Sequence, residues 1–92
     1  MVTREQLLQV CGDDATPYRN HNIDHVFELV KLLRERIPYD ECKQIIGNVG
    51  HELIYLPDVE LVLKHLNEND LLILEECNTS INCEFDCLYL FI

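Results

Sequence analysis

The stretch LLILEECNTSINCEFDCLYLFI, residues 71–92, decides the expected fold. Two runs rich in Leu, Ile, Phe and Tyr, over 71–76 and 81–91, are separated by the segment CNTS, residues 77–80, which predicts a β-hairpin. Apolar and polar residues alternate over 81–87, so one face of that strand should enter the core and the other should meet water. All four charged residues of the stretch are acidic. The hairpin is therefore predicted to present a purely negative outer face.

Helices are predicted upstream of the hairpin. Apolar residues recur at helical spacing from Ile23 to Ile37, and Thr3 with Gln6 forms a capping-box pattern. Pro38 ends the long helix and suits the first position of another. The predicted helices cover residues 3–11, 23–37, 38–46 and 59–66, with a loop over 13–22 and a short strand over 52–56. This indicates an α+β fold in one domain over residues 1–92, with three to four helices packed on a small antiparallel sheet that ends in a C-terminal hairpin.

The cysteines argue against a disulfide framework and against a metal site. Their odd number, five, and the lack of any C-x-x-C pair fit a reducing compartment, so we expect reduced thiols that pack in the core. On one strand, Cys83 and Cys87 would lie about 13 Å apart, which is too far to share a tetrahedral zinc ion. No metal or other cofactor is expected.

Charge is the strongest compositional signal. Seventeen acids and seven bases give a formal net charge of -10. Residues 1–43 hold eight acids and six bases, whereas residues 44–92 hold nine acids and only Lys64. Such a surface repels nucleic acid and anionic membranes and attracts cationic proteins over a distance set by salt. The expected partner is a basic protein.

Acids in the second half of the chain are the candidate partner-binding residues. On the predicted strand, Glu84 and Asp86 would project from the wet face about 6.6 Å apart, a spacing that resembles a row of backbone phosphates. Acids of the first half lie among bases and should contribute less. A solvated face without a partner is the alternative interpretation. The candidate acids are Asp58, Glu60, Glu68, Asp70, Glu75, Glu76, Glu84 and Asp86.

Catalysis has little support in the sequence. His21 and His25 lie in HNIDH, which lacks the glutamate placement of the H-E-x-x-H metalloprotease motif, and no Gly-rich phosphate loop is present. A cysteine nucleophile with a distant histidine stays open, but nothing marks one cysteine over the others.

The sequence predicts neither a membrane span nor a signal peptide. The longest apolar run has six residues, far short of the roughly 20 that cross a bilayer, and the start of the chain does not read as a signal peptide. We expect a cytoplasmic protein that is not an enzyme.

The size and acidity of the chain, its start MVTREQLLQV and its richness in Asn, Asp and Ile resemble the family of small anti-restriction nuclease proteins of T-even bacteriophages. The resemblance implies a phage DNA mimic that acts in the host cytoplasm. Its targets would be a modification-dependent restriction nuclease of the McrBC type and other basic DNA-binding proteins of the host, such as histone-like proteins. It also implies a dimer.

Two other classes of function are alternatives to the mimic. An immunity-type inhibitor of one basic toxin also predicts a cationic partner. A helix-turn-helix regulator using residues 23–47 is disfavoured because a DNA reader needs a basic footprint. A homodimer is expected because two-fold symmetry would double the charge row and hide residues 88–92, which are apolar on both faces of the predicted strand.

Overall fold

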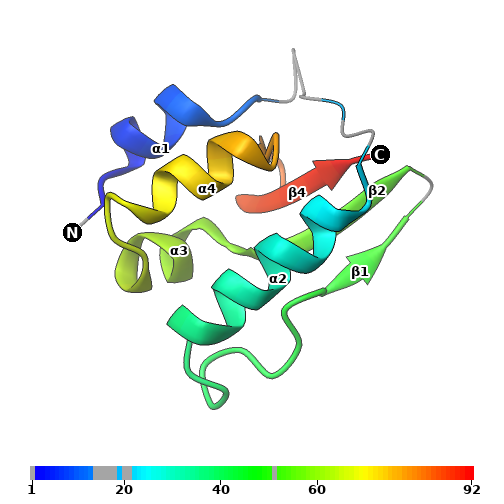
Figure 1. The fold of residues 1–92 in the computed structure, drawn as a ribbon. Helices are drawn as coiled ribbons and strands as arrows, with labels where there is room; N and C mark the ends of the chain where they lie inside the picture. The colour runs from blue at the N-terminus through cyan, green and yellow to red at the C-terminus, as the bar shows by residue number, and fades with distance from the viewer. Residues whose placement is uncertain (1, 14–18, 20–21, 51) are drawn as a thin grey trace.

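The computed structural model describes residues 2–13, 19, 22–50 and 52–92, and these form helices and a single antiparallel sheet (Figure 1). The predicted α+β class is confirmed. The sheet has the strand order β1-β2-β4-β3, and α4 packs against both α1 and α2. In chain order the elements are α1 (Arg4–Val10), α2 (Asp24–Arg36), β1 (Asn48–Val49), β2 (Leu53–Asp58), α3 (Val59–His65), α4 (Asp70–Glu76), β3 (Ser80–Asn82) and β4 (Cys87–Phe91).

The core lies between the helices and one face of the two central strands. Leu88 and Leu90 of β4 are fully buried, and Leu90 pairs with Ile54 of β2. Leu29 of α2 and Leu74 of α4 are also fully buried in the same cluster. Because side chains alternate along a strand, residues such as Tyr55 and Tyr89, which pair with each other, project from the opposite face.

Side-chain hydrogen bonds hold the starts of the first two helices. The Thr3 side chain accepts a hydrogen bond from the Gln6 backbone N–H, and the Gln6 side chain accepts one from the Thr3 N–H, which confirms the capping box. The Asn22 side chain accepts from the backbone N–H of Asp24 at 3.0 Å. Most of the predicted loop over 13–22, together with His21, lies outside the described residues.

The predicted helix over residues 38–46 is wrong, because this segment makes only turns. The carbonyl oxygen of Pro38 accepts hydrogen bonds from the backbone N–H groups of Glu41 and Cys42, which closes one turn. The guanidinium of Arg34 then binds the carbonyl oxygens of Ile37, Cys42 and Lys43 at 2.7 to 3.3 Å. These carbonyls are satisfied by a side chain of α2, so the segment needs no helical ladder of its own.

The predicted strand over residues 71–76 is also wrong, because this segment is helix α4. Asn67 and Asp70 each accept a hydrogen bond from the other's backbone N–H, which stabilises the first turn of the helix. Leu71 and Leu74 are buried while Leu72 is exposed, a helical rather than alternating pattern.

The C-terminal hairpin exists, but its turn lies further along the chain than predicted. Strands β3 and β4 are joined by residues 83–86, so Cys83 and Phe85 are exposed rather than in the core. No disulfide joins the five cysteines, all of which lie within the described residues. Burial is confirmed for Cys11, Cys77 and Cys87.

Strand β2 contains a bulge at its end. Tyr55 pairs with Tyr89, but Asp58 rather than Pro57 pairs with Cys87, so β2 has one extra residue. Pro57 has no N–H to donate, and a bulge is one of the few places in a sheet that tolerates proline. The bulge turns Asp58 to the face that carries Tyr55 and Cys87.

Candidate protein-binding surface

The structure divides the exposed predicted acids between two regions instead of one row, because the Val59 backbone N–H donates to the Asp86 carbonyl at 2.9 Å and so places Asp58 and Glu60 beside the β3–β4 turn. Glu68, Glu75 and Glu76 are exposed on or just before α4. Asp58 ends β2 and Glu60 begins α3, and both are exposed. Glu84 and Asp86 lie in the turn between β3 and β4.

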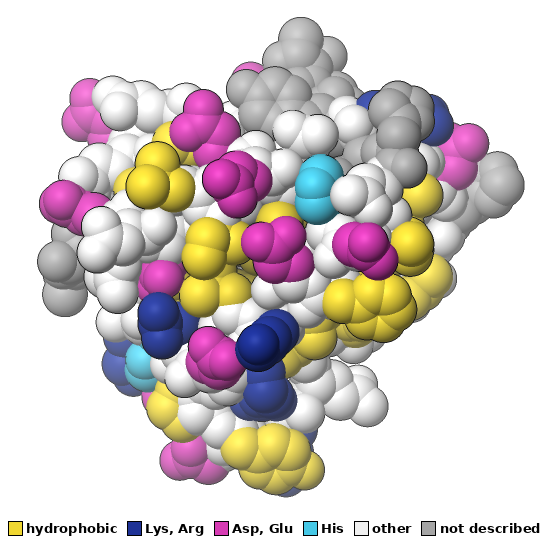
Figure 2. All heavy atoms as spheres, viewed as in Figure 1, with side chains coloured by type: hydrophobic (Ala, Val, Ile, Leu, Met, Phe, Trp, Pro, Cys, Tyr) yellow, Lys and Arg dark blue, Asp and Glu magenta, His cyan; other side chains and the backbone are white. Residues whose placement is uncertain are grey.

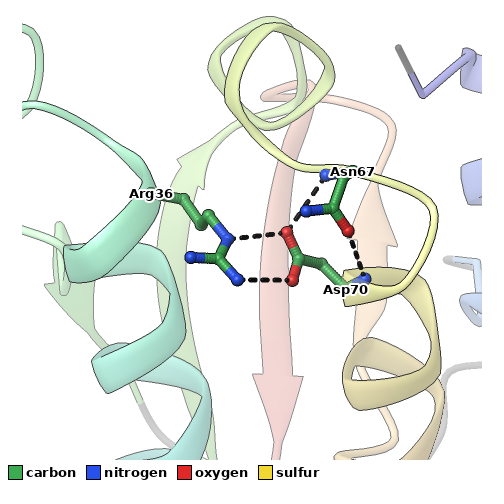
Figure 3. A network of polar contacts seen from close by, with 3 residues as sticks. All are labelled: Arg36, Asn67 and Asp70. Atoms are coloured by element: carbon green, nitrogen blue, oxygen red, sulfur yellow. Dashed lines mark hydrogen bonds and ion pairs between the residues drawn. The ribbon is translucent and has the colours of Figure 1, made fainter.

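The prediction that Asp70 is a surface acid is wrong, because Asp70 is only 2% exposed and links α4 to α2. Its carboxylate accepts hydrogen bonds from Arg36 Nε at 2.9 Å, from Arg36 Nη2 at 3.2 Å and from the Asn67 backbone N–H at 3.0 Å (Figure 3). Burial acts to raise the pKa of Asp70, but the hydrogen bonds from Arg36 and Asn67 and the charge of Arg36 outweigh it, so the pKa lies below its ordinary value. Asp70 is therefore a structural ion pair, not a site for a partner.

The predicted pair of Glu84 and Asp86 on a strand face is also wrong. Asp86 has a positive φ of 52° in the turn, and its carboxylate binds both Nη atoms of Arg4, at 2.8 and 3.0 Å. The hydrogen bond from Arg4 is the main cause that lowers the pKa of Asp86. Since Arg4 neutralises Asp86, the turn offers a partner the charge of Glu84 alone.

Two further acids are paired. Glu41 lies 2.7 Å from Lys64 Nζ and 2.9 Å from His65 Nε2, and hydrogen bonds from these two side chains lower its pKa. Glu52 lies 3.7 Å from Arg19. With Asp70 and Asp86, these pairs neutralise much of the basic charge of the chain.

A larger acidic surface lies on the outer sides of α2 and α4. Positions 24, 28 and 35 follow one exposed stripe of α2, and positions 68, 75 and 76 extend along α4. Figure 2 shows acidic side chains spread over this side of the molecule. The charge of Arg36 is neutralised by Asp70, whereas Lys31 and Arg34, whose guanidinium binds only neutral carbonyl oxygens, keep their positive charges on α2. We call this surface the helical acidic face: Asp24, Glu28, Glu35, Glu68, Glu75 and Glu76.

Cys77 shows how closely the two helices approach at one end of this face. Its Sγ lies 3.9 Å from a carboxylate oxygen of Glu28. Burial, followed by the charges of Glu28 and Glu76, raises the pKa of the Cys77 thiol to about 12. Carboxylates from both halves of the sequence thus meet here. The expectation that first-half acids contribute little rested on their basic neighbours; of these, Arg36 is neutralised by Asp70, whereas Lys31 lies on the same exposed stripe as Glu28 and Glu35.

Large apolar side chains are exposed on the same two helices. Phe27 is 68% exposed, Leu72 62% and Ile23 58%. Figure 2 shows hydrophobic side chains between the acidic ones. Exposed apolar groups with a polar rim are typical of protein-binding surfaces. The helical spacing of apolar residues predicts Ile23 and Phe27 on the buried side of α2, so the sequence did not reveal that they are exposed.

The apolar end of the chain does not need a second copy to cover it. Leu88, Tyr89 and Leu90 are buried within the chain, because β4 lies between β2 and β3. A homodimer stays a prediction, but the need to cover residues 88–92 no longer supports it.

The described residues show neither a metal centre nor a membrane-crossing helix. Within that part of the chain, no three His, Cys, Asp or Glu side chains come together in a way that could hold a metal ion. None of its helices is long and apolar enough to cross a membrane.

No known protein family, curated protein or solved structure matches this chain. The surface proposed below is therefore argued from the residues of this chain, and the proposed targets come from the resemblance described above.

Proposed function

We propose that the protein is an acidic inhibitor that occupies the DNA-binding site of a basic DNA-binding protein through the helical acidic face. The observation that carries this proposal is a set of six exposed carboxylates, five on α2 and α4 and that of Glu68 just before α4, against the positive charges of Lys31 and Arg34. A restriction nuclease of the McrBC type and histone-like proteins are the proposed targets. A homodimer would extend the charged surface.

The amount of charge is comparable with that of a short duplex. The molecule extends 28 × 26 × 25 Å. Duplex DNA of about 25 Å carries roughly 15 phosphates, at one per about 1.7 Å of axis, of which about half face any one protein. Six carboxylates over a similar length approach that number. Along α2, Asp24 and Glu28 are separated by about 6 Å of helix axis, and rigid helices hold such charges in place.

A displacement assay tests the proposal. A labelled 20-base-pair duplex is bound to a histone-like protein and to a McrBC-type nuclease, and fluorescence anisotropy follows its release as this protein is added. We expect full release, weakened roughly tenfold or more between 50 and 200 mM salt because charge contacts are screened. Duplex that stays bound at a large excess of the protein in 50 mM salt would argue against mimicry.

An immunity-type inhibitor of a single basic toxin is the second candidate, and the exposed Phe27 and Leu72 favour it. A phosphate mimic needs charge, whereas a dedicated inhibitor commonly anchors itself with a buried aromatic residue. Phe27→Ala should change duplex displacement by less than about threefold if mimicry is the function. A larger loss, together with activity against one target only, would favour the dedicated inhibitor.

A further inference from the structure

A second candidate site lies on the opposite side of the sheet from the helical acidic face. A cavity of about 230 Å³ opens between β1, the second half of β2, the β3–β4 turn and the start of β4. Tyr55 and Phe85 form two of its walls, with ring centroids 5.9 Å apart and ring planes at 88°. Asp58 supplies the carboxylate. The remaining lining residues are Asn48, Leu56 and Cys87.

The bulge in β2 brings the carboxylate to the aromatic rings. Without the extra residue, position 58 would share the face of Ile54 and Leu56, which is the core. With it, Asp58 pairs with Cys87 and joins the face of Tyr55. Bulges commonly re-aim a side chain in this way. Asp58 makes no side-chain hydrogen bond to the start of α3, so helix capping does not account for its position.

The turn that carries Phe85 is held at several points. Arg4 binds the Asp86 side chain with two hydrogen bonds, and the Val59 backbone N–H donates to the Asp86 carbonyl at 2.9 Å. The Phe85 N–H donates to the Asn82 side chain at 2.9 Å. The ring of Phe85 is nevertheless 61% exposed. A large aromatic ring held outward on a fixed turn is preorganised for a contact rather than buried as core.

The chemistry of the cavity favours a planar cation. Its lining residues include one acid and no base. Aromatic faces attract cations, and guanidinium groups stack on them more readily than ammonium groups do. The chain already makes this contact twice: Arg19 lies 4.2 Å from the ring centroid of Phe91, and Arg34 lies 5.5 Å from that of Tyr39.

We propose that the cavity formed by Tyr55, Asp58 and Phe85 binds the guanidinium of an arginine side chain from another protein. The guanidinium stacks on an aromatic ring while Asp58 accepts its N–H groups. This inference does not depend on the function proposed for the helical acidic face, because the two sites use different residues on opposite sides of the sheet.

Titration with N-acetyl-arginine amide, followed by ¹H–¹⁵N correlation spectra, tests the site. N-acetyl-citrulline amide is the control ligand, since it has the same shape without the charge. We expect saturable shifts at residues around the cavity, with an affinity in the millimolar range, and at least fivefold weaker binding of the citrulline compound. Equal binding of the two compounds, or unsaturated shifts spread over all acidic residues, would overturn the proposal.

Matched variants locate the binding. Asp58→Asn and Phe85→Leu should each weaken arginine binding at least fivefold, whereas Phe85→Tyr, which keeps the ring, should retain it. Glu84→Gln removes the same charge from the neighbouring turn and should change the affinity less than twofold. The spectra themselves show whether each variant is folded. If Asp58→Asn binds as well as the original chain, or if Glu84→Gln loses as much, the assignment is wrong.

Discussion

The Asp70–Arg36 ion pair makes a quantitative prediction about stability. Asp70→Asn keeps the shape of the side chain but removes its negative charge. In the original chain, the Asp70 carboxylate accepts hydrogen bonds from three N–H groups. Breaking one partner of a fully buried ion pair costs roughly 3–5 kcal/mol. The Arg36 side chain is 38% exposed, so water can partly replace the lost contact. We therefore expect a loss of about 2–3 kcal/mol in the free energy of unfolding at pH 7, discounted for that exposure.

Urea denaturation followed by circular dichroism would measure this loss, and the melting temperature should fall by roughly 10–20 °C. Glu75→Gln is the matched control, because it removes one charge from the exposed side of the same helix. It should change the free energy of unfolding by less than about 0.5 kcal/mol.

The pH dependence adds a second check. The folded pKa of Asp70 is depressed, so its contribution is present above the ordinary aspartate value of about 4 and is lost as the pH falls through the folded pKa. The difference between the original chain and Asp70→Asn should shrink below about pH 4. A loss under about 0.5 kcal/mol at pH 7, or a difference that does not shrink in acid, would refute the reasoning.

Two smaller predictions follow from the other contacts. Thr3→Ala removes the capping box of α1 and should lower the free energy of unfolding by about 1 kcal/mol, measured by urea denaturation; no change would mean that the box contributes nothing. Burial raises the pKa of Cys11 to about 12, and burial with nearby acids raises that of Cys77 to about 12, so neither forms much thiolate at pH 8. A disulfide reagent in the folded state should modify the exposed Cys83 at least tenfold faster than either, as peptide mapping would show; equal rates would contradict this burial.

The sequence predicted those elements whose signals are local. The helical period of α2 and the capping box of α1 depend on residues within one or two turns, and both elements are confirmed, although Ile23 and Phe27 of the predicted apolar stripe are exposed. The run from Leu71 to Leu74 fits either a strand or a buried helix, because four consecutive apolar residues have no period. Asn67 and the ion pair to Arg36, which lies 34 residues away, favour the helix.

The candidate site was less predictable, because it depends on contacts between distant residues. Four acids are neutralised by partners between 23 and 82 residues away in the sequence, and no pattern of neighbouring residues reveals such pairs. Arg4 and Asp86, for example, are 82 residues apart. The bulge that re-aims Asp58 was hinted at only by Pro57 within a strand. The charge of each half of the chain predicts a positively charged partner, but it does not predict which surface of the fold carries the exposed acids.

The most direct test of the central claim compares two triple variants in the duplex displacement assay. One carries Glu28→Lys, Glu75→Lys and Glu76→Lys on the helical acidic face. The other carries Asp40→Lys, Glu60→Lys and Glu84→Lys, three exposed acids outside that face, so both variants change the net charge equally. Circular dichroism would confirm that both are folded. We predict at least a tenfold loss of displacement for the first variant and less than about threefold for the second. Equal losses would show that net charge alone is responsible, and unchanged displacement by the first variant would contradict the proposed surface.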